Sequence, residues 1–227
     1  HASLLTGLLP PEHGVRDNLG YRLDAVKHPT LAARLRHAGY VTGGAVSAWV
    51  MRGATGLGSG FDFYEDSLVA PAVVDVAGAI QRPGGETLDL LLPWLTKAQA
   101  GPFFLFFHIY EPHAPWEPAE PFKGRYADPY DGEVATADAI VGRLLDELRR
   151  RGLYDQALIV LLSDHGEGLR DHGEEYHGIL LYREVLHVPL LIKLPAGARG
   201  GERVALAVPL EDVTPTLLEA AALPLPQ

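Results

Sequence analysis

Residues 163–177 concentrate the side chains of this sequence that can do chemistry. They read S-D-H-G-E-G-L-R-D-H-G-E-E-Y-H, with three histidines, five carboxylates and three glycines. A core segment cannot carry this load, because unpaired charge is very costly to bury. The stretch directly follows residues 157–162, an apolar run short enough to be a buried strand. Because ligands gather at the carboxyl ends of strands in α/β sheets, we expect this acid–histidine segment at the mouth of a site.

Asp164 and His165 form the sharpest pair in the segment. A carboxylate oxygen and an imidazole nitrogen on adjacent residues of a turn can both reach one divalent cation. A histidine ligand suits Mn²⁺, Zn²⁺ or Fe and disfavours Ca²⁺, which prefers an all-oxygen shell. The alternative is an aspartate that caps a turn beside a surface histidine. Spacing alone does not choose between them, since metal sites usually need three or more protein ligands.

The elements around this segment predict the fold class. Amphipathic helices are expected at residues 30–38, 86–100 (with Pro93 kinking or dividing it), 131–151 and 213–222. Strands are expected at 40–48, 102–109, 157–162 and 188–194, with a glycine-rich loop at 52–66. Helices that alternate with apolar strands indicate an α/β fold, a mostly parallel sheet sandwiched between helices.

Composition narrows the function classes. The chain has 227 residues, a formal net charge of -10 and no cysteine. No Lys/Arg cluster favours nucleic acid, and no apolar run reaches the roughly 20 residues of a membrane span. Thiolate metal sites and disulfides are excluded, while the compartment stays undetermined.

Motifs in the order expected of one family now accumulate along the chain. S-D-H-G-E-x-L-x-D-H-G-E followed by V-P-L-L-I-K-L-P resembles the sulfatase family of the alkaline phosphatase superfamily. The strand that leads into His113-Ala114-Pro115, the opening H-A-S-L-L-T-G with H-G-V-R-D-N, and D-V-T-P-T-L-L near the end resemble other segments of that family. The resemblance covers nearly the whole chain and is strongest to bacterial sulfatase-like proteins. It implies a single sulfatase-like catalytic domain over residues 1–227, truncated at both ends.

The resemblance also implies roles for individual residues. Asp164 and His165 match a family pair that binds a divalent metal, here Mn, Zn, Ca or Mg. His113 matches a histidine that contacts the anionic oxygens or the leaving group of an ester. His177 stands where the family has a lysine, so its charge depends on pH. Asn18, His1 and, more weakly, Ser47 match positions near the substrate.

The family nucleophile would lie just before His1, so we expect this fragment to be inactive alone and to bind metal weakly or not at all. His1 stands at the arginine of the signature for formylglycine, which favours an unmodified Thr or Ser. The expected reaction is hydrolysis of small anionic sulfate, phosphate or phosphonate esters. A phosphoethanolamine or phosphoglycerol transferase and a non-catalytic binding domain are the alternatives. Neither nucleic acid nor membrane contact is expected, and exposed sheet edges predict self-association.

Overall fold

The computed structural model describes residues 1–68, 80–98 and 100–225, which form two compact units. The first unit contains His1–Ile140 and Val208–Gln227, and the second contains Val141–Ala207. No helix in the described part of the chain is both long and apolar enough to cross a membrane. The single-domain expectation stays a prediction, and each unit is described here by itself.

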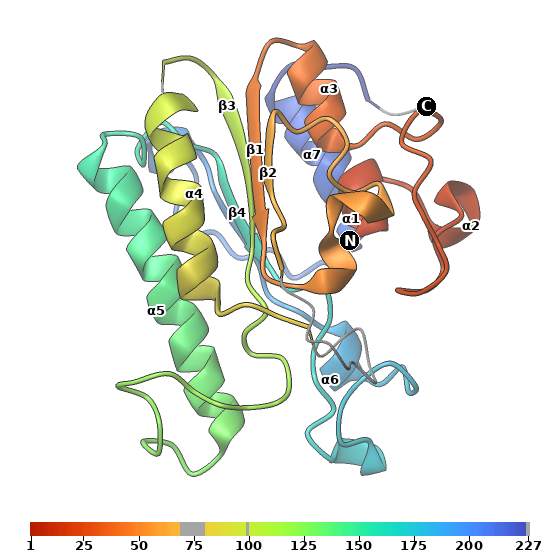
Figure 1. Cartoon of the computed structure of the whole chain (residues 1–227), viewed down its shortest axis with the longest axis vertical. Helices are drawn as coiled ribbons and strands as arrows, with labels where there is room; N and C mark the ends of the chain where they lie inside the picture. Colours follow the sequence, from red (N-terminus) through yellow and green to blue (C-terminus); the bar gives the residue numbers. More distant parts are fainter. Residues whose placement is uncertain (69–79, 99, 226–227) are drawn as a thin grey trace. The chain divides into compact units, whose positions relative to one another are not determined.

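The first unit is built on a three-stranded parallel sheet. Its order is β2 (Phe63–Glu65), β1 (Val41–Val46), β3 (Phe103–His108). The helices of this unit are α1 (Ala2–Thr6), α2 (Pro10–His13), α3 (Leu31–His37), α4 (Gly84–Ala98), the start of α5 (Pro129–Arg150) and α7 (Val213–Ala220). Figure 1 shows α4 on one side of the strands, with α3 and α7 on the other. Val46 of β1 is level with His108 of β3, so both strands deliver their last residues to the same edge.

Two adjacent glycines let β1 pack tightly on both faces. A Cβ at Gly43 would lie 2.4 Å from the indole of Trp94 on α4, and one at Gly44 would lie 2.7 Å from the ring of Tyr64. The glycines that weaken β1 as a strand in the sequence therefore make room for aromatic rings. On the α3 side, Leu31 and Leu218 belong to one apolar cluster, against which Phe104 packs.

The second unit contains the rest of α5, β4 (Ile159–Leu162), α6 (Arg183–Leu186) and β5 (Leu190–Lys193). Strands β4 and β5 pair antiparallel, with Ile159 opposite Lys193. Leu161, Leu191 and Ile192 are 42%, 56% and 45% exposed. Short 3-10 turns occur in the two units at Trp49–Met51, Gly53–Thr55, Asp171–Gly173, Pro195–Gly197 and Leu210–Asp212.

The parallel sheet with helices on both faces confirms the expected fold class, with three local corrections. Strand β2 lies inside residues 52–66, which we expected to be loop throughout. Pro93 does not divide α4, which runs unbroken for 15 residues. Strand β4, expected to be buried, instead exposes Leu161, and it pairs antiparallel with β5.

Candidate active site

The acid–histidine segment is held in the second unit by close approaches between backbones. Gly166 N–H donates to Val185 O at 2.7 Å, and Gly168 N–H donates to Tyr176 O at 2.8 Å. A Cβ at Gly166 would lie 2.0 Å from Glu184 O, and one at Gly168 would lie 2.4 Å from Tyr176 O. Glycine is therefore the residue that permits these contacts, which explains the spacing of the D-H-G-E-G motif.

Asp164 and His165 present their side chains from the turn that follows β4. His165 Nδ1 is 2.9 Å from Gly166 O. A carbonyl only accepts hydrogen bonds, so Nδ1 carries the proton and the lone pair of the neutral ring is on Nε2. His165 Nε2 lies 3.7 Å from Asp164 Oδ2, and the two side chains are 38% and 32% exposed. A proton on Nδ1 that is donated to a backbone carbonyl is one of the arrangements found in histidines that bind a metal through Nε2.

His177 joins this pair through its ring. The imidazoles of His165 and His177 stack with centroids 4.0 Å apart. His177 Nδ1 lies 3.1 Å from Glu167 Oε1, and the Glu167 side chain is 5% exposed. A buried carboxylate therefore fixes the orientation of His177. The structure thus brings Asp164, His165 and His177 together, while their roles at a metal or substrate stay predictions.

Glu174 has a different task from Glu167. Its Oε1 accepts hydrogen bonds from Ile179 N–H at 2.9 Å and from Leu180 N–H at 3.2 Å. Glu174 is buried, with 9% of its surface exposed. It thus shapes the backbone after His177. His172, outside the expected site, pairs with Glu184 at 2.6 Å and stacks on Tyr182.

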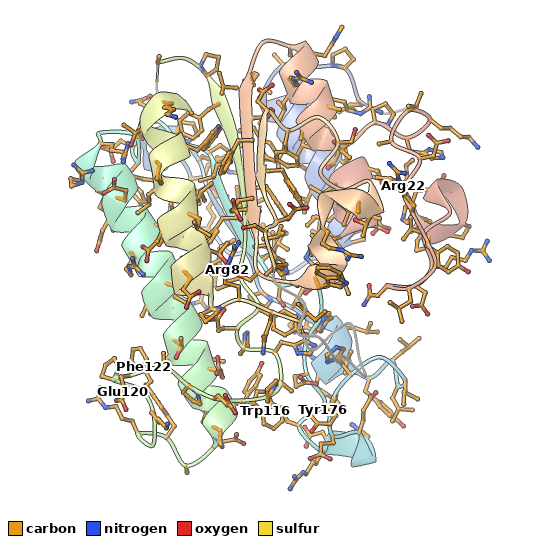
Figure 2. All side chains as sticks on the ribbon, viewed as in Figure 1. Arg22, Arg82, Trp116, Glu120, Phe122 and Tyr176 are labelled. Atoms are coloured by element: carbon orange, nitrogen blue, oxygen red, sulfur yellow. The ribbon has the colours of Figure 1, made fainter. Side chains whose placement is uncertain are left out.

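In the first unit, His113 lies on residues 111–117, here called the His113 loop. Its ring stacks on Tyr110 with centroids 4.2 Å apart, and Tyr110 Oη lies 3.3 Å from His113 Nε2. His113 Nδ1 donates to Ala114 O at 2.7 Å, so the neutral ring has its lone pair on Nε2. Trp116 instead packs edge-on against Tyr130 of α5. Figure 2 shows Trp116 on one side of the start of α5, with Glu120 and Phe122 on the other.

Two other predicted residues, His1 and Ser47, both lie against His108 at the end of β3. The His1 and His108 rings meet edge to face with centroids 5.0 Å apart, and Ser47 N–H donates to His108 Nδ1 at 3.4 Å. The Ser47 hydroxyl is fully buried and lies 2.7 Å from Thr87 Oγ1. Arg82 donates to Thr87 Oγ1 at 2.9 Å and to Val46 O at 3.1 Å. The contacts give the Ser47 side chain a structural role, and its substrate contact stays a prediction.

Asn18 and Ser3 lie on the opening segment. Asn18 is exposed on the loop after α2. Val15 N–H donates to His13 Nδ1 at 3.1 Å, so Nε2 of the neutral His13 carries the proton and donates to Ser3 Oγ at 3.0 Å. Burial lowers the pKa of His13, which keeps the ring neutral. His13 therefore cannot act as a base toward the Ser3 hydroxyl in this arrangement.

Sequence reasoning left out two residues that contact the predicted ones and a third that holds the His113 loop. Tyr110 stacks on His113, and His108 joins His1 to Ser47. Glu111 fixes the His113 loop through Gly84. Tyr110 and Glu111 directly follow a predicted strand, and this position was the available signal. No sequence signal pointed to the partners of these residues that are distant in the chain.

The pair of Asp164 and His165 fits part of a metal shell. Bonds from a cation to a histidine nitrogen or a carboxylate oxygen are about 2.0–2.2 Å long, so one ion can contact two donors 3.7 Å apart. Within residues 1–68, 80–98 and 100–225, no group of three or more His, Asp or Glu side chains is arranged to hold a metal. The two donors fit one edge of a coordination shell and do not complete it.

Solved structures define the class of this fold. A protein solved in complex with its substrate D-glucosamine-2-N,6-O-disulfate superimposes with a TM-score of 0.79 at 18% identity, covering 99% of this chain and 67% of that one. The phosphonate monoester hydrolase of Agrobacterium radiobacter gives 0.78 at 21% identity, covering 99% and 64%. The chain therefore has the α/β fold of sulfatases and phosphonate monoester hydrolases.

Sequence comparison gives the family. The Sulfatase family profile matches residues 1–223, so the chain belongs to the sulfatase family of the alkaline phosphatase superfamily. Arylsulfatase K of Bos taurus is 37% identical over 98 residues, and that of Homo sapiens is 35% identical over 98 residues. Each match covers 43% of this chain and 18% of the relative, so the chain spans less than a fifth of these curated relatives. Metal dependence is typical of the family.

Proposed function

We propose that the whole protein is a metal-dependent hydrolase of small anionic esters, with sulfate, phosphate or phosphonate as the reacting group. Family membership over residues 1–223 supports hydrolysis of an ester. The arrangement of His165 carries the proposal. Its Nδ1 is bonded to Gly166 O and its Nε2 lies 3.7 Å from Asp164 Oδ2.

In this proposal Asp164 and His165 hold the divalent metal. When bound, the metal supplies positive charge that stabilises the anionic oxygens of the ester. A histidine donor favours Mn²⁺ or Zn²⁺ over Ca²⁺. The exposure of both side chains leaves room for donors from elsewhere in the whole protein.

In this proposal His113 stabilises negative charge on the ester or donates a proton to it. Protonation of its ring at Nε2 makes that atom a donor, while Nδ1 keeps its bond to Ala114 O. The imidazolium can then donate to an anionic oxygen or to the leaving group. His177, whose Nδ1 is held by Glu167, is proposed to contact an anionic oxygen of the ester.

None of the hydroxyl groups near these segments is assigned as the nucleophile. Ser3 Oγ accepts from His13, and Ser47 Oγ is buried against Thr87. Ser163 Oγ donates to His165 O at 2.5 Å. We propose that another part of the whole protein supplies the nucleophile, and that His1, Asn18 and Ser47 contribute to substrate binding.

Two substrate classes follow from the relatives. Arylsulfatase K and the protein bound to the disulfated glucosamine point to a sulfate ester, including one on a sugar. The phosphonate monoester hydrolases point to a phosphonate ester. Aryl sulfate, aryl phosphate and phenylphosphonate esters, assayed side by side, separate these classes.

The metal assignment is tested in the whole protein by elemental analysis and activity. We expect about one divalent metal per chain in the parent. H165A and D164N should lose most of this metal, and their activity should fall by at least about 100-fold. The matched control is H172A, which removes a histidine of the same segment that pairs with Glu184. It should keep its metal and stay within about twofold of the parent. Full metal occupancy in both H165A and D164N contradicts the proposal.

A further inference from the structure

The His113 loop is fastened at its first residue by a carboxylate from its own sequence. Glu111 Oε1 accepts a hydrogen bond from Gly84 N–H at 2.8 Å, and Gly84 is the first residue of α4. The first N–H groups of a helix have no acceptor within the helix, and negative charge is favoured there. Glu111 therefore binds the loop to a 15-residue helix that packs on the sheet.

The space around this contact admits little change. A Cβ at Gly84 would lie 2.8 Å from Glu111 Oε2 and 2.7 Å from Ile109 Cγ2. Glu111 Oε2 itself is buried, and the described residues offer it no hydrogen-bond partner. The approach of Glu111 to α4 thus requires a glycine, which has no Cβ, at position 84 and the full length of the glutamate side chain.

A second carboxylate fastens the other end of the loop. Glu133 Oε1, on the first turns of α5, accepts from Glu117 N–H at 2.9 Å. One turn further on, Thr136 Oγ1 accepts from Ala119 N–H at 3.3 Å. Glu133 is 5% exposed. Burial, together with the nearby Glu111, raises the pKa of Glu133, so the two carboxylates are close enough to affect each other.

We propose that Glu111 and Glu133 are positioning residues for His113, which together fix the loop that carries it. They hold residues 111 and 117, while the His113 ring is oriented between them by Tyr110 and by Ala114 O. The task of His113 at the ester rests on the proposed function, whereas the fixing of its ring does not.

The test follows the His113 ring directly, by nuclear magnetic resonance of the ring nitrogens in the labelled whole protein. In the parent, the ring should show one neutral tautomer with the proton on Nδ1. E111D keeps the charge but is one methylene too short to reach Gly84, and E111Q keeps the length and an acceptor oxygen. We expect E111D to shift His113 toward the tautomer mixture of a solvated histidine, and E111Q to keep the parent signal. The matched control E120A removes an exposed carboxylate beyond the loop and should change nothing.

Glu133 and activity give the second arm. E133A should shift the ring-nitrogen signal of His113 as E111D does, whereas E133Q should keep the parent signal. In the whole protein E111D should lose at least about tenfold in kcat with little change in KM, because positioning acts on the reacting geometry. An unchanged His113 signal in both E111D and E133A overturns the proposal that Glu111 and Glu133 position His113. This holds even if both variants unfold more easily. If H113A keeps full activity while E111D still changes the ring-nitrogen signal of His113, the positioning by Glu111 and Glu133 is supported. In that case the proposed role of His113 at the ester is wrong.

Discussion

The two segments that carry the candidate chemistry differ in the contacts that hold them in place. The His113 loop is fastened by side chains, with Glu111 bonded to Gly84 and Glu133 bonded to Glu117 N–H. The acid–histidine segment is fastened by backbone, with Gly166 bonded to Val185 O and Gly168 to Tyr176 O. A side-chain anchor can be shortened or neutralised gradually, whereas a backbone contact tolerates no added atom. The two segments should therefore differ in how sharply substitutions damage them.

The largest effect is expected at the backbone contact of Gly166. G166A would place a Cβ 2.0 Å from Glu184 O, and the backbone must move to relieve this overlap. We expect a loss of about 3 kcal/mol in unfolding free energy, measured by urea denaturation. Hydrogen exchange should show the loss concentrated in residues 163–187.

The control for this prediction is Gly142, in the middle of α5, where a Cβ would meet nothing within 4 Å. G142A should stabilise the chain by about 0.5–1 kcal/mol, because alanine favours a helix interior over glycine. If G166A is as mild as G142A, the backbone does not fix the segment and the contrast between the two segments disappears.

An intermediate effect is expected where the acid–histidine segment uses a side chain. E174A removes the acceptor of Ile179 N–H and Leu180 N–H, and should cost about 2 kcal/mol. The neighbouring E175A breaks an ion pair with Arg170 whose side chains are 49% and 78% exposed, and should change stability by less than about 0.5 kcal/mol. Both values come from the same denaturation series. Equal costs for E174A and E175A would show that the Glu174 bonds do not hold this turn.

Local patterns predicted the elements of the fold and the partners that are near in sequence. The apolar runs at 102–109 and 157–162 became strands, and Asp164 was expected beside His165. Strand β2 was missed because it has three half-buried residues within a glycine-rich stretch, too few to show an alternation.

Contacts between distant residues explain what the sequence did not reveal. The Ser47 hydroxyl, placed near the substrate because it follows a strand, is bonded to Thr87, 40 residues later. The partner of Glu111 is a backbone N–H 27 residues earlier. No periodicity within a window of 11–18 residues reports such a pairing. The pair proposed to bind metal, Asp164 and His165, could be singled out from the sequence because its two residues are adjacent in the chain.

The smallest expected effect is the pH dependence of the side-chain anchor at Glu133. Burial, and then the nearby Glu111, raise the pKa of Glu133 above its ordinary value of 4.5, while the Glu117 N–H acts against them and Glu117 itself adds to the rise. The folded state therefore binds more protons than the unfolded state just above pH 4.5, so stability falls as the pH rises through this window. E133Q cannot titrate and keeps an acceptor oxygen for Glu117 N–H. As the pH rises from 4 to 7, E133Q should therefore become more stable relative to the parent, by less than the cost of E174A. A constant difference in unfolding free energy between E133Q and the parent across this range would mean that the charge of Glu133 does not destabilise the folded state. The side-chain anchors would then respond to shape alone, as the backbone contacts of the other segment do.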